Sequence, residues 1–381
     1  MRNTCIFFLM AALMLAGCRK EELIYVPEQV DLAQPEYTSV ERMFVLCEGN
    51  MGTNKATLDY YDYNEGRYYR DAFPHFNPGT VREMGDVGND LGIYGSKLYA
   101  VINCSNKIDV LNKHTLKKVG QVDIPNCRFI KFHEGYAYVT SYAGPVEINP
   151  DYTQRGYVAK VDTTTLQVVD RCLVGFQPDE LEIVNGKIYV ANSGGYMVPN
   201  YENTISVIDL ATFTEERRIP IAINLKSVCC DKRGILWITS RGDYYDTSSR
   251  LYAYDIIHDR MVKEFDCRVS SLWMDGDSIY VAAVEWSYIT AQNTKSFAII
   301  NTATMQQVTS QFITDGTDAD ITIPYGVAVH PITKDIYVTD AKDYVSPGRL
   351  YCFGPDGKKK WDVRTGDIPG HFAFLGKETS E

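Results

Sequence analysis

The chain has 381 residues, a formal net charge of −11 and 12% aromatic residues, among them 27 tyrosines. The acidic balance argues against nucleic-acid binding, which depends on clustered Lys and Arg. Beyond the first residues, no apolar stretch approaches the roughly 20 residues needed to cross a bilayer, and the aromatic content favours a β-rich fold.

The first residues predict a lipoprotein signal peptide over residues 1–17. Arg2 precedes an apolar run of about 11 residues, which is too short for a membrane helix and typical of a secretory signal. Leu-Ala-Gly-Cys at residues 15–18 resembles the lipobox of bacterial lipoproteins, so we expect cleavage before Cys18 and lipid on its sulfur. The charged residues 19–22 resemble the export signal of Bacteroidota surface lipoproteins. The expected location is the outer membrane, facing the cell exterior.

Residues 18–40 are expected to form a tether. After the lipidated Cys18 this stretch is polar, contains Pro27 and Pro35, and has no apolar period. Such a composition is typical of a flexible linker. We therefore place the folded domain at residues 41–381.

One short strand recurs seven times along this domain. Its copies lie at residues 43–45, 98–101, 137–140, 188–191, 236–239, 279–282 and 336–339, with a mean step of about 49 residues. Most copies follow a tight turn such as Asn185-Gly186, and a loop and a second hairpin come after each. Four strands per unit and seven units predict an all-β, seven-bladed β-propeller with four-stranded blades. Stacked β-sandwiches would not explain the regular step.

The two ends of the domain predict how the ring closes. The first unit starts near Arg42 and lacks a leading inner strand, whereas the apolar residues 370–375 have no partners of their own. We expect this C-terminal strand to complete the first blade.

Sequence motifs for catalysis or metal binding are weak. The loop at residues 49–55 lacks the Gly-Lys-Ser/Thr ending of a phosphate loop, the six histidines are scattered, and Gly-x-Ser-x-Gly does not occur. We therefore expect no catalytic residues, no metal ligands and no cofactor. Residues 315–320 gather three aspartates, which fit either a solvated acidic loop or a calcium site.

The loops that follow the recurring strand carry large polar aromatic residues in five consecutive blades. These residues are Tyr142, Tyr152, Tyr196, Tyr201, Tyr244, Tyr245, Trp286, Tyr288 and Tyr344. In a propeller such loops open on one face, and Tyr and Trp are favoured at binding surfaces. We predict a ligand-binding face there. The alternative is that these side chains only pack against neighbouring blades.

The segments that enter the inner strands supply a second group of candidate ligand-binding residues around the central channel. They are Asp90, Arg128, Asp179, Glu180, Lys226, Ser271, Tyr325 and His371. The set mixes both charges with neutral donors and acceptors. It suits a large, polar, roughly neutral ligand, although the same residues would also serve as an ordinary hydrated rim.

The cysteine spacing contains no C-x-x-C pair. Cys104 follows a strand of the second blade and Cys127 enters the third, so both are expected near the same face. A disulfide between them is a candidate pairing, since an oxidising location would allow it.

The recurring units also resemble a known family. Tyr-Val-Thr-Ser at 138–141, Tyr-Val-Ala-Asn at 189–192 and Tyr-Val-Thr-Asp at 337–340 resemble the Tyr-Val-Thr-Asn repeats of surface-layer-like propellers. With the lipobox, the export signal and the Tyr-rich loops, the chain resembles the BtuG-type surface lipoproteins that capture vitamin B12 in gut Bacteroidota.

This resemblance implies that cobalamin or another corrinoid is held as a bound ligand, not as a catalytic cofactor. It also implies handover to a TonB-dependent outer-membrane transporter of the BtuB type, on which the propeller sits as a lid. A surface module that grips a protein or a glycan, without a small-molecule ligand, is the alternative.

Overall fold

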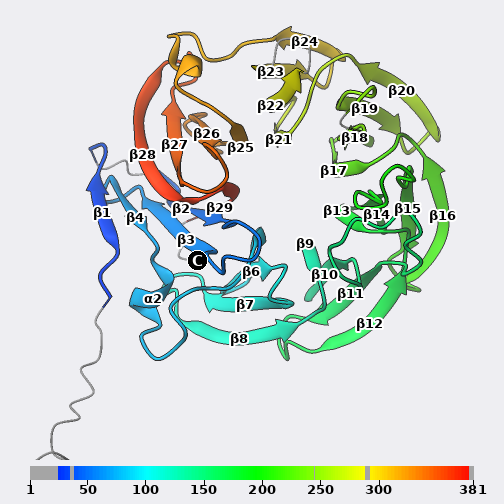
Figure 1. Cartoon of the computed structure of the whole chain (residues 1–381), viewed down its shortest axis with the longest axis horizontal. Coiled ribbons are helices and arrows are strands. Elements are labelled where there is room, and N and C mark those ends of the chain that lie inside the picture. The colour runs from blue at the N-terminus through cyan, green and yellow to red at the C-terminus, as the bar shows by residue number, and fades with distance from the viewer. Residues whose placement is uncertain (1–24, 35–37, 244, 288–291, 377–381) are drawn as a thin grey trace, which may run out of the picture.

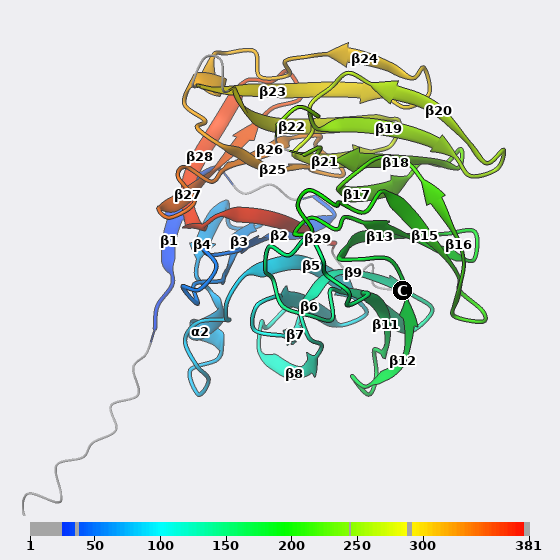
Figure 2. The same cartoon turned by 45° about the vertical axis from the view of Figure 1, so that its right-hand side comes forward.

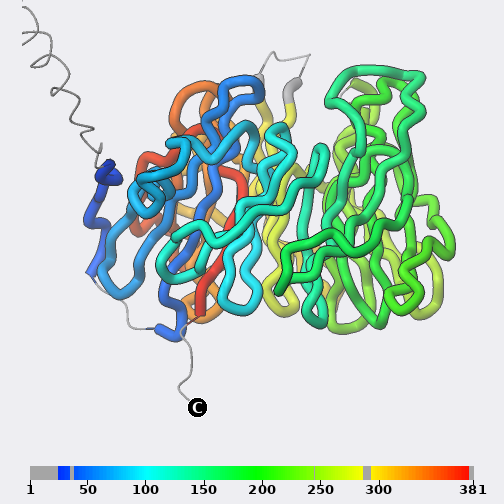
Figure 3. The backbone as a smooth tube through the Cα atoms, turned by 90° about the horizontal axis from the view of Figure 1, so that it is seen from below, coloured from blue at the N-terminus to red at the C-terminus, as the bar shows by residue number. Residues whose placement is uncertain are grey.

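The protein is a β-propeller with seven blades arranged in a ring (Figure 1). The structure is a computed structural model that describes residues 25–34, 38–243, 245–287 and 292–376. Within these residues the strands form seven antiparallel sheets, six with four strands and one with five. Seen from the side, the strands run between the two faces of the disc (Figure 3). The predicted fold class is confirmed.

Each blade has the same strand order from the channel outward. The inner strands are β29 (Pro369–Gly376), β5 (Gly88–Tyr94), β9 (Cys127–His133), β13 (Pro178–Val184), β17 (Leu225–Cys230), β21 (Ser271–Asp275) and β25 (Pro324–Val329). The second strands are β2 (Val40–Cys47), β6 (Lys97–Ile102), β10 (Tyr136–Ser141), β14 (Lys187–Asn192), β18 (Ile235–Ser240), β22 (Ser278–Ser287) and β26 (Ile336–Asp340).

The outer half of each blade is built from two further strands. The third strands are β3 (Thr57–Asp62), β7 (Lys107–Asn112), β11 (Tyr157–Asp162), β15 (Thr204–Asp209), β19 (Arg250–Asp255), β23 (Gln292–Asn301) and β27 (Pro347–Phe353). The outer strands are β4 (Arg67–Arg70), β8 (Lys118–Asp123), β12 (Val168–Leu173), β16 (Thr214–Pro220), β20 (Arg260–Phe265), β24 (Gln306–Thr309) and β28 (Lys359–Asp367). Two short helical turns, α2 (Phe73–Phe76) and η2 (Thr317–Ala319), lie between blades.

The recurring sequence motif is the second strand of every blade, and in β10, β18 and β26 it carries a threonine with a specific role. The inner strand is bulged where it meets the second strand, which leaves one inner-strand amide without a ladder partner. In the third blade this amide is that of Phe129, and it donates a hydrogen bond to Thr140 Oγ1 at 3.0 Å. The same contact joins Thr239 to Ser227 and Thr339 to Gly326.

The residue after this threonine ties the second strand to the segment that enters the inner strand. Ser141 Oγ donates to the carbonyl of Pro125 at 2.5 Å, and Ser240 Oγ donates to that of Ile223 at 2.6 Å. The loops after the second strands and the loops before the inner strands therefore lie together at one face. We call this face the upper face.

Apolar side chains fill the space between neighbouring blades. One buried cluster joins Val101 and Ile108 of the second blade to Ile130 and Val139 of the third. The fully buried Trp237 has the same role further round the ring. Because burial of each such side chain contributes about 1.5–3 kcal/mol, blade-to-blade packing is the main stabilising term of the ring.

The C-terminal strand closes the ring as predicted. β29 pairs with β2, with Phe44 opposite Ala373 and Val45 opposite Phe372. Figures 1 and 2 show β29 lying beside β2 on the channel side of the first blade. The first blade therefore combines strands from both ends of the chain.

The expected tether over residues 18–40 contains a strand, β1 (Glu28–Asp31), which is the fifth strand of the first blade. It pairs with β4, and ion pairs join Asp31 to Arg67 and Glu28 to Arg70, each at 2.6 Å. Since β1 is antiparallel to β4, its first residue lies near the upper face.

Residues just before β1 are also held on the first blade. The Tyr25 hydroxyl donates to Asp71 at 3.0 Å, and the Tyr25 carbonyl lies 2.8 Å from His75 Nδ1. The predicted signal peptide and Cys18 lie outside the described residues. No helix in the described part of the chain is long and apolar enough to span a membrane.

Candidate functional site

A central cavity of about 1770 Å³ follows the axis of the ring, and its lining extends from the loops of the upper face to the turns that follow the inner strands β17 and β21. Its walls come from the inner strands of all seven blades and from loops of the upper face. Ordinary small-molecule pockets hold roughly 300–1,000 Å³. The cavity is therefore large enough for a ligand well above that class.

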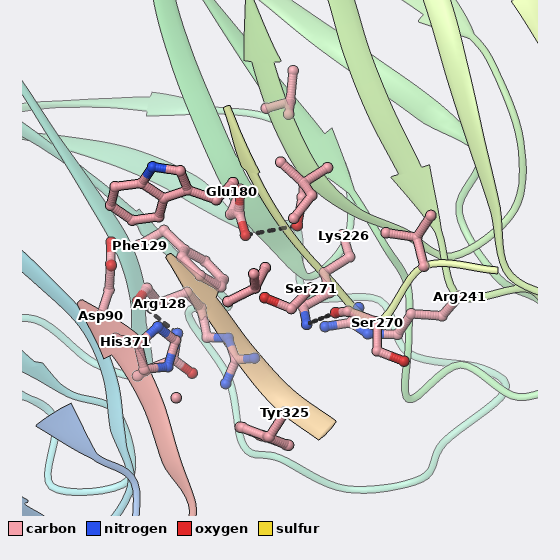
Figure 4. Close-up of a pocket in the computed structure, with 18 of the residues that line it drawn as sticks. Asp90, Arg128, Phe129, Glu180, Lys226, Arg241, Ser270, Ser271, Tyr325 and His371 are labelled. Atoms are coloured by element: carbon pink, nitrogen blue, oxygen red, sulfur yellow. Dashed lines mark hydrogen bonds between the residues drawn. The ribbon is translucent and has the colours of Figure 1, made fainter. Parts of the chain in front are cut away.

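The structure brings most of the predicted channel residues together. The residues that line the cavity are Asp90, Arg128, Glu180, Lys226, Ser271, Tyr325 and His371. Figure 4 shows them converging from different inner strands. Asp179 does not line the cavity, because its side chain is fully buried behind the wall.

Asp179 holds two arginines of the wall in place. Its Oδ1 accepts from Arg128 Nε at 3.2 Å, and its Oδ2 accepts from Arg241 Nη1 at 2.6 Å. The Tyr142 hydroxyl donates to Oδ1 at 2.7 Å, and the Arg128 guanidinium lies over the Tyr142 ring. Burial alone would raise the pKa of Asp179, but Arg241 and Arg128 outweigh it and keep the pKa below its usual range.

Other polar groups of the wall bond across neighbouring blades. Lys226 Nζ donates to the carbonyl of Ser270 at 2.6 Å. The same pattern appears in two further pairs, in which Asp90 accepts from the Ile130 amide and Glu180 from the Ser227 hydroxyl, both at 2.8 Å. These contacts fix the side chains before any ligand arrives.

Glu48 also lies at the rim of the cavity, and its carboxylate was not among the residues predicted from the sequence. Its Oε1 lies 3.0 Å from His371 Nε2. Glu48 follows β2, and Arg241 follows β18, so both belong to the loops after second strands. The sequence reading of those loops considered only aromatic residues, which is why it missed both.

The predicted aromatic residues divide into buried and exposed groups. Tyr142, with 1% of its surface exposed, and Tyr152 are buried and do not line the cavity. For these two, the packing role that the sequence left open is the one observed. The Tyr142 amide donates to the Asn126 carbonyl, and the Tyr142 hydroxyl donates to the buried Asp179.

Three of the remaining predicted aromatic residues lie at the mouth of the cavity. Tyr196, Tyr245 and Tyr344 line the mouth, and Tyr245 and Tyr344 are 74% and 39% exposed. The Tyr344 ring meets Tyr325 edge-on at 6.1 Å. Tyr201 is half-buried outside the cavity, where its hydroxyl donates to the Asp243 carbonyl. Tyr244, Tyr288 and the side chain of Trp286 lie outside the described residues.

Aromatic residues also line the deeper part of the cavity, which the sequence did not indicate. Phe132 and Trp273 face this region from the third and sixth blades. Phe132 stacks on Tyr94 at 5.2 Å, and Trp273 meets Phe374 edge-on at 5.8 Å. Sequence alone could not separate these residues from packed core residues, because both kinds alternate along the same strands.

The acidic segment at residues 315–320 is bonded to the protein itself. Asp315 accepts backbone amides from Thr317 and Lys359. The ammonium group of Lys295 donates to the carbonyls of Asp318 and Ile321. Among the described residues, no group of three or more His, Cys, Asp or Glu side chains is placed to hold a metal ion.

The candidate disulfide between Cys104 and Cys127 is not formed, so that pairing was wrong. Cys127 is buried inside the third blade, where its thiol faces the Lys107 carbonyl at 3.4 Å. Cys104 is half-buried, and its thiol faces the side chain of Asn103. The two thiols therefore contact different groups.

Proteins of several unrelated kinds have a similar fold. A periplasmic gluconolactonase from Pseudomonas aeruginosa is 12% identical, with a TM-score of 0.61, over 88% of this chain and 99% of that one. A hypothetical selenium-binding protein from Sulfolobus tokodaii is 11% identical, with a TM-score of 0.65, over 90% and 95%. A quinonprotein alcohol dehydrogenase-like protein from Bacteroides thetaiotaomicron is 13% identical, with a TM-score of 0.58, over 89% and 79%.

At these identities the likeness extends to the fold alone. No curated protein matches the chain in sequence. Residues 41–360 match the family described as a domain of unknown function, DUF5074, and the chain belongs to that family.

Proposed function

We propose that this protein is a non-catalytic cell-surface receptor that captures cobalamin or related corrinoids in its central cavity. In this proposal Cys18 carries the lipid anchor in the outer membrane, and the ligand passes to a TonB-dependent transporter on which the propeller sits as a lid. The observation that carries the proposal is the cavity of about 1770 Å³, walled by all seven inner strands and rimmed by tyrosines.

The chemistry of the wall matches the chemistry of a corrinoid. A corrin is a wide disc fringed by amide groups, which both donate and accept hydrogen bonds. The wall offers donors such as Lys226 and acceptors such as Glu180, and the mouth offers the rings of Tyr196, Tyr325 and Tyr344. Tyrosine gives a broad contact area at low entropic cost, which favours tight binding.

The wall is organised for holding a ligand without converting it. Asp179, Asp90 and Glu180 already accept hydrogen bonds from protein groups, and these bonds join neighbouring blades. A wall fixed in this way pays little ordering entropy on binding. We therefore assign the cavity to capture rather than to turnover.

Titration calorimetry with cyanocobalamin tests the proposal on the chain from residue 19 onward, which keeps every described residue. We expect heat of binding and a red protein fraction after desalting. Tyr325→Ala should weaken binding at least about 10-fold, since buried aromatic anchors contribute about 2 kcal/mol or more. Tyr136→Ala is the matched control. Tyr136 begins β10, at the end of that strand away from the upper face, and it does not line the cavity.

A colourless protein with no heat of binding would contradict corrinoid capture. Retention of a protein or glycan partner by that colourless protein would then support the interaction-module alternative. The lid role has its own test, which is co-purification of the lipid-anchored protein with a TonB-dependent barrel from outer membranes.

A further inference from the structure

The central cavity has two levels with different chemistry. The upper level contains the charged side chains of Arg128, Lys226 and Arg241. The lower level contains the apolar side chains of Phe132 and Trp273, together with Ile93, Met274 and the ion pair of Lys131 with Glu182. Residues four positions apart on one inner strand are about 13 Å apart, so Arg128 and Phe132 on β9 lie at clearly different depths.

The three cations of the upper level lie close together. Arg128 and Arg241 bind the two oxygens of one carboxylate, that of Asp179. Lys226 lies near enough to Arg241 for their charges to interact. Burial, and then Arg241, lowers the pKa of Lys226. Figure 4 shows the Lys226 and Arg241 side chains side by side at the cavity wall.

The acidic groups near these cations are hydrogen-bonded within the protein. Asp179 accepts from both arginines and from Tyr142. Glu180 accepts from Ser227, and Glu48 pairs with His371. Lys226 donates to a neutral backbone carbonyl, that of Ser270. Arg128 and Arg241 share the Asp179 carboxylate, whereas Lys226 lies near Glu180 and Glu48. The three cationic side chains line the cavity together, where they can bind an anionic ligand group.

The lower level suits a flat ring. Trp273 comes from the sixth blade and Phe132 from the third, so aromatic groups reach the channel from opposite parts of the ring. Both side chains are half-buried rather than sealed in the core. A planar heterocycle inserted there would gain stacking and apolar contact with both.

We propose that the channel contains a subsite for a phosphate-linked heterocycle, with the phosphate bound by Arg128, Lys226 and Arg241 and the ring inserted toward Trp273 and Phe132. This inference rests on the proposed function, because in cobalamin the group of this class is the nucleotide tail. The corrin disc would then lie at the tyrosine-rich mouth, and the tail would enter the channel below it.

Comparing cyanocobalamin with dicyanocobinamide, which lacks the nucleotide tail, tests the subsite by calorimetry. We expect the wild-type chain from residue 19 to bind cyanocobalamin at least about 10-fold more tightly. Lys226→Met and Trp273→Leu should each reduce this ratio of dissociation constants by about 10-fold. Arg217→Met and Trp361→Leu are matched controls outside the cavity, and both should keep the ratio.

Each outcome separates the two proposals. Equal binding of the two corrinoids by the wild-type chain would overturn the subsite and leave corrinoid capture standing. The same conclusion would follow if Lys226→Met weakened both ligands by one factor. If neither corrinoid bound, the proposed function itself would fail. Lys226→Met keeps the test decisive even if Trp273→Leu disturbs folding, because Trp273 also packs against Phe374.

Discussion

The backbone amide of Gly366 donates to the buried carboxylate of Asp59 at 3.1 Å, although 307 positions separate the two residues. Asp59 also accepts from the Tyr68 hydroxyl at 2.9 Å and from the Asp71 amide at 2.8 Å. Gly366 belongs to the last outer strand and Asp59 to the first blade. The ring is therefore closed at two places, by this contact and by β29.

Removal of β29 should open the ring. A chain that ends at Asp367 loses the pairing of β29 with β2 and exposes the apolar side of the first blade. We expect it to lose the cooperative thermal unfolding that circular dichroism would record for the full chain. A chain that ends at Gly376 is the control and should melt like the full chain; normal melting of the shorter chain would argue against closure by this strand.

The stability of the ring should depend on the ionisation of Asp59. Burial raises the pKa of Asp59 from 3.8 to about 6. Between about pH 4 and pH 6 the folded chain keeps a proton that the unfolded chain releases, so the free energy of unfolding falls as pH rises through this window. A shift of this size corresponds to up to about 3 kcal/mol.

The comparison with Asp59→Asn isolates this effect. His330, whose pKa burial lowers to about 4, acts in the opposite direction over a similar range and is present in both chains. Urea unfolding should show that the stability advantage of wild type over Asp59→Asn is larger at pH 4.5 than at pH 7. An advantage that does not change with pH would contradict the assignment.

The Tyr142 hydroxyl should contribute measurably to stability. Tyr142→Phe removes the hydrogen bond to the charged Asp179, and such bonds contribute about 1.5–3 kcal/mol. Tyr152→Phe is a matched control. Among the described residues, the buried Tyr152 hydroxyl has no hydrogen-bond partner, so its loss should change stability by less than about 0.5 kcal/mol. Urea unfolding of both variants would reveal the difference, and equal effects would exclude a special role for the Asp179 contact.

Thiol labelling should give a full count of reactive cysteines. The described part of the chain contains eight cysteines, from Cys47 to Cys352. None of these eight forms a disulfide in the structure. Iodoacetamide in denaturant without reductant should therefore add eight groups to the chain from residue 19, as measured by mass spectrometry. Two fewer adducts would show that a pair such as Cys104 and Cys127 oxidises in the folded protein.

The architecture was predictable because it rests on periodic signals. Residues such as Tyr138 and Tyr337 recur with a mean step of about 49 residues, and a repeated unit that cannot bury its apolar side alone must stack on its neighbours. Most channel residues could be placed for the same reason. Lys226 and His371, for example, enter inner strands, and the fold directs that position to the axis.

The roles of the loop aromatics could not be predicted, because the direction of a loop side chain depends on distant partners. Tyr142 turns inward toward Asp179, which lies 37 positions later, whereas Tyr344 stays at the mouth. The strand β1 escaped prediction for a related reason. Its sequence is mostly polar, and ion pairs with Arg67 and Arg70 stabilise it rather than apolar burial.

The position of β1 has a consequence for a chain held by lipid at Cys18. Tyr25 is bound beside the upper face by Asp71 and His75, and the Arg82 guanidinium lies 4.9 Å from its ring centre. Seven Cα steps from Cys18 to Tyr25 span at most about 25 Å. In the proposed lipoprotein, a connection of this length would keep Tyr25, and with it one edge of the upper face, within about 25 Å of the lipid anchor and so close to a transporter in the same membrane.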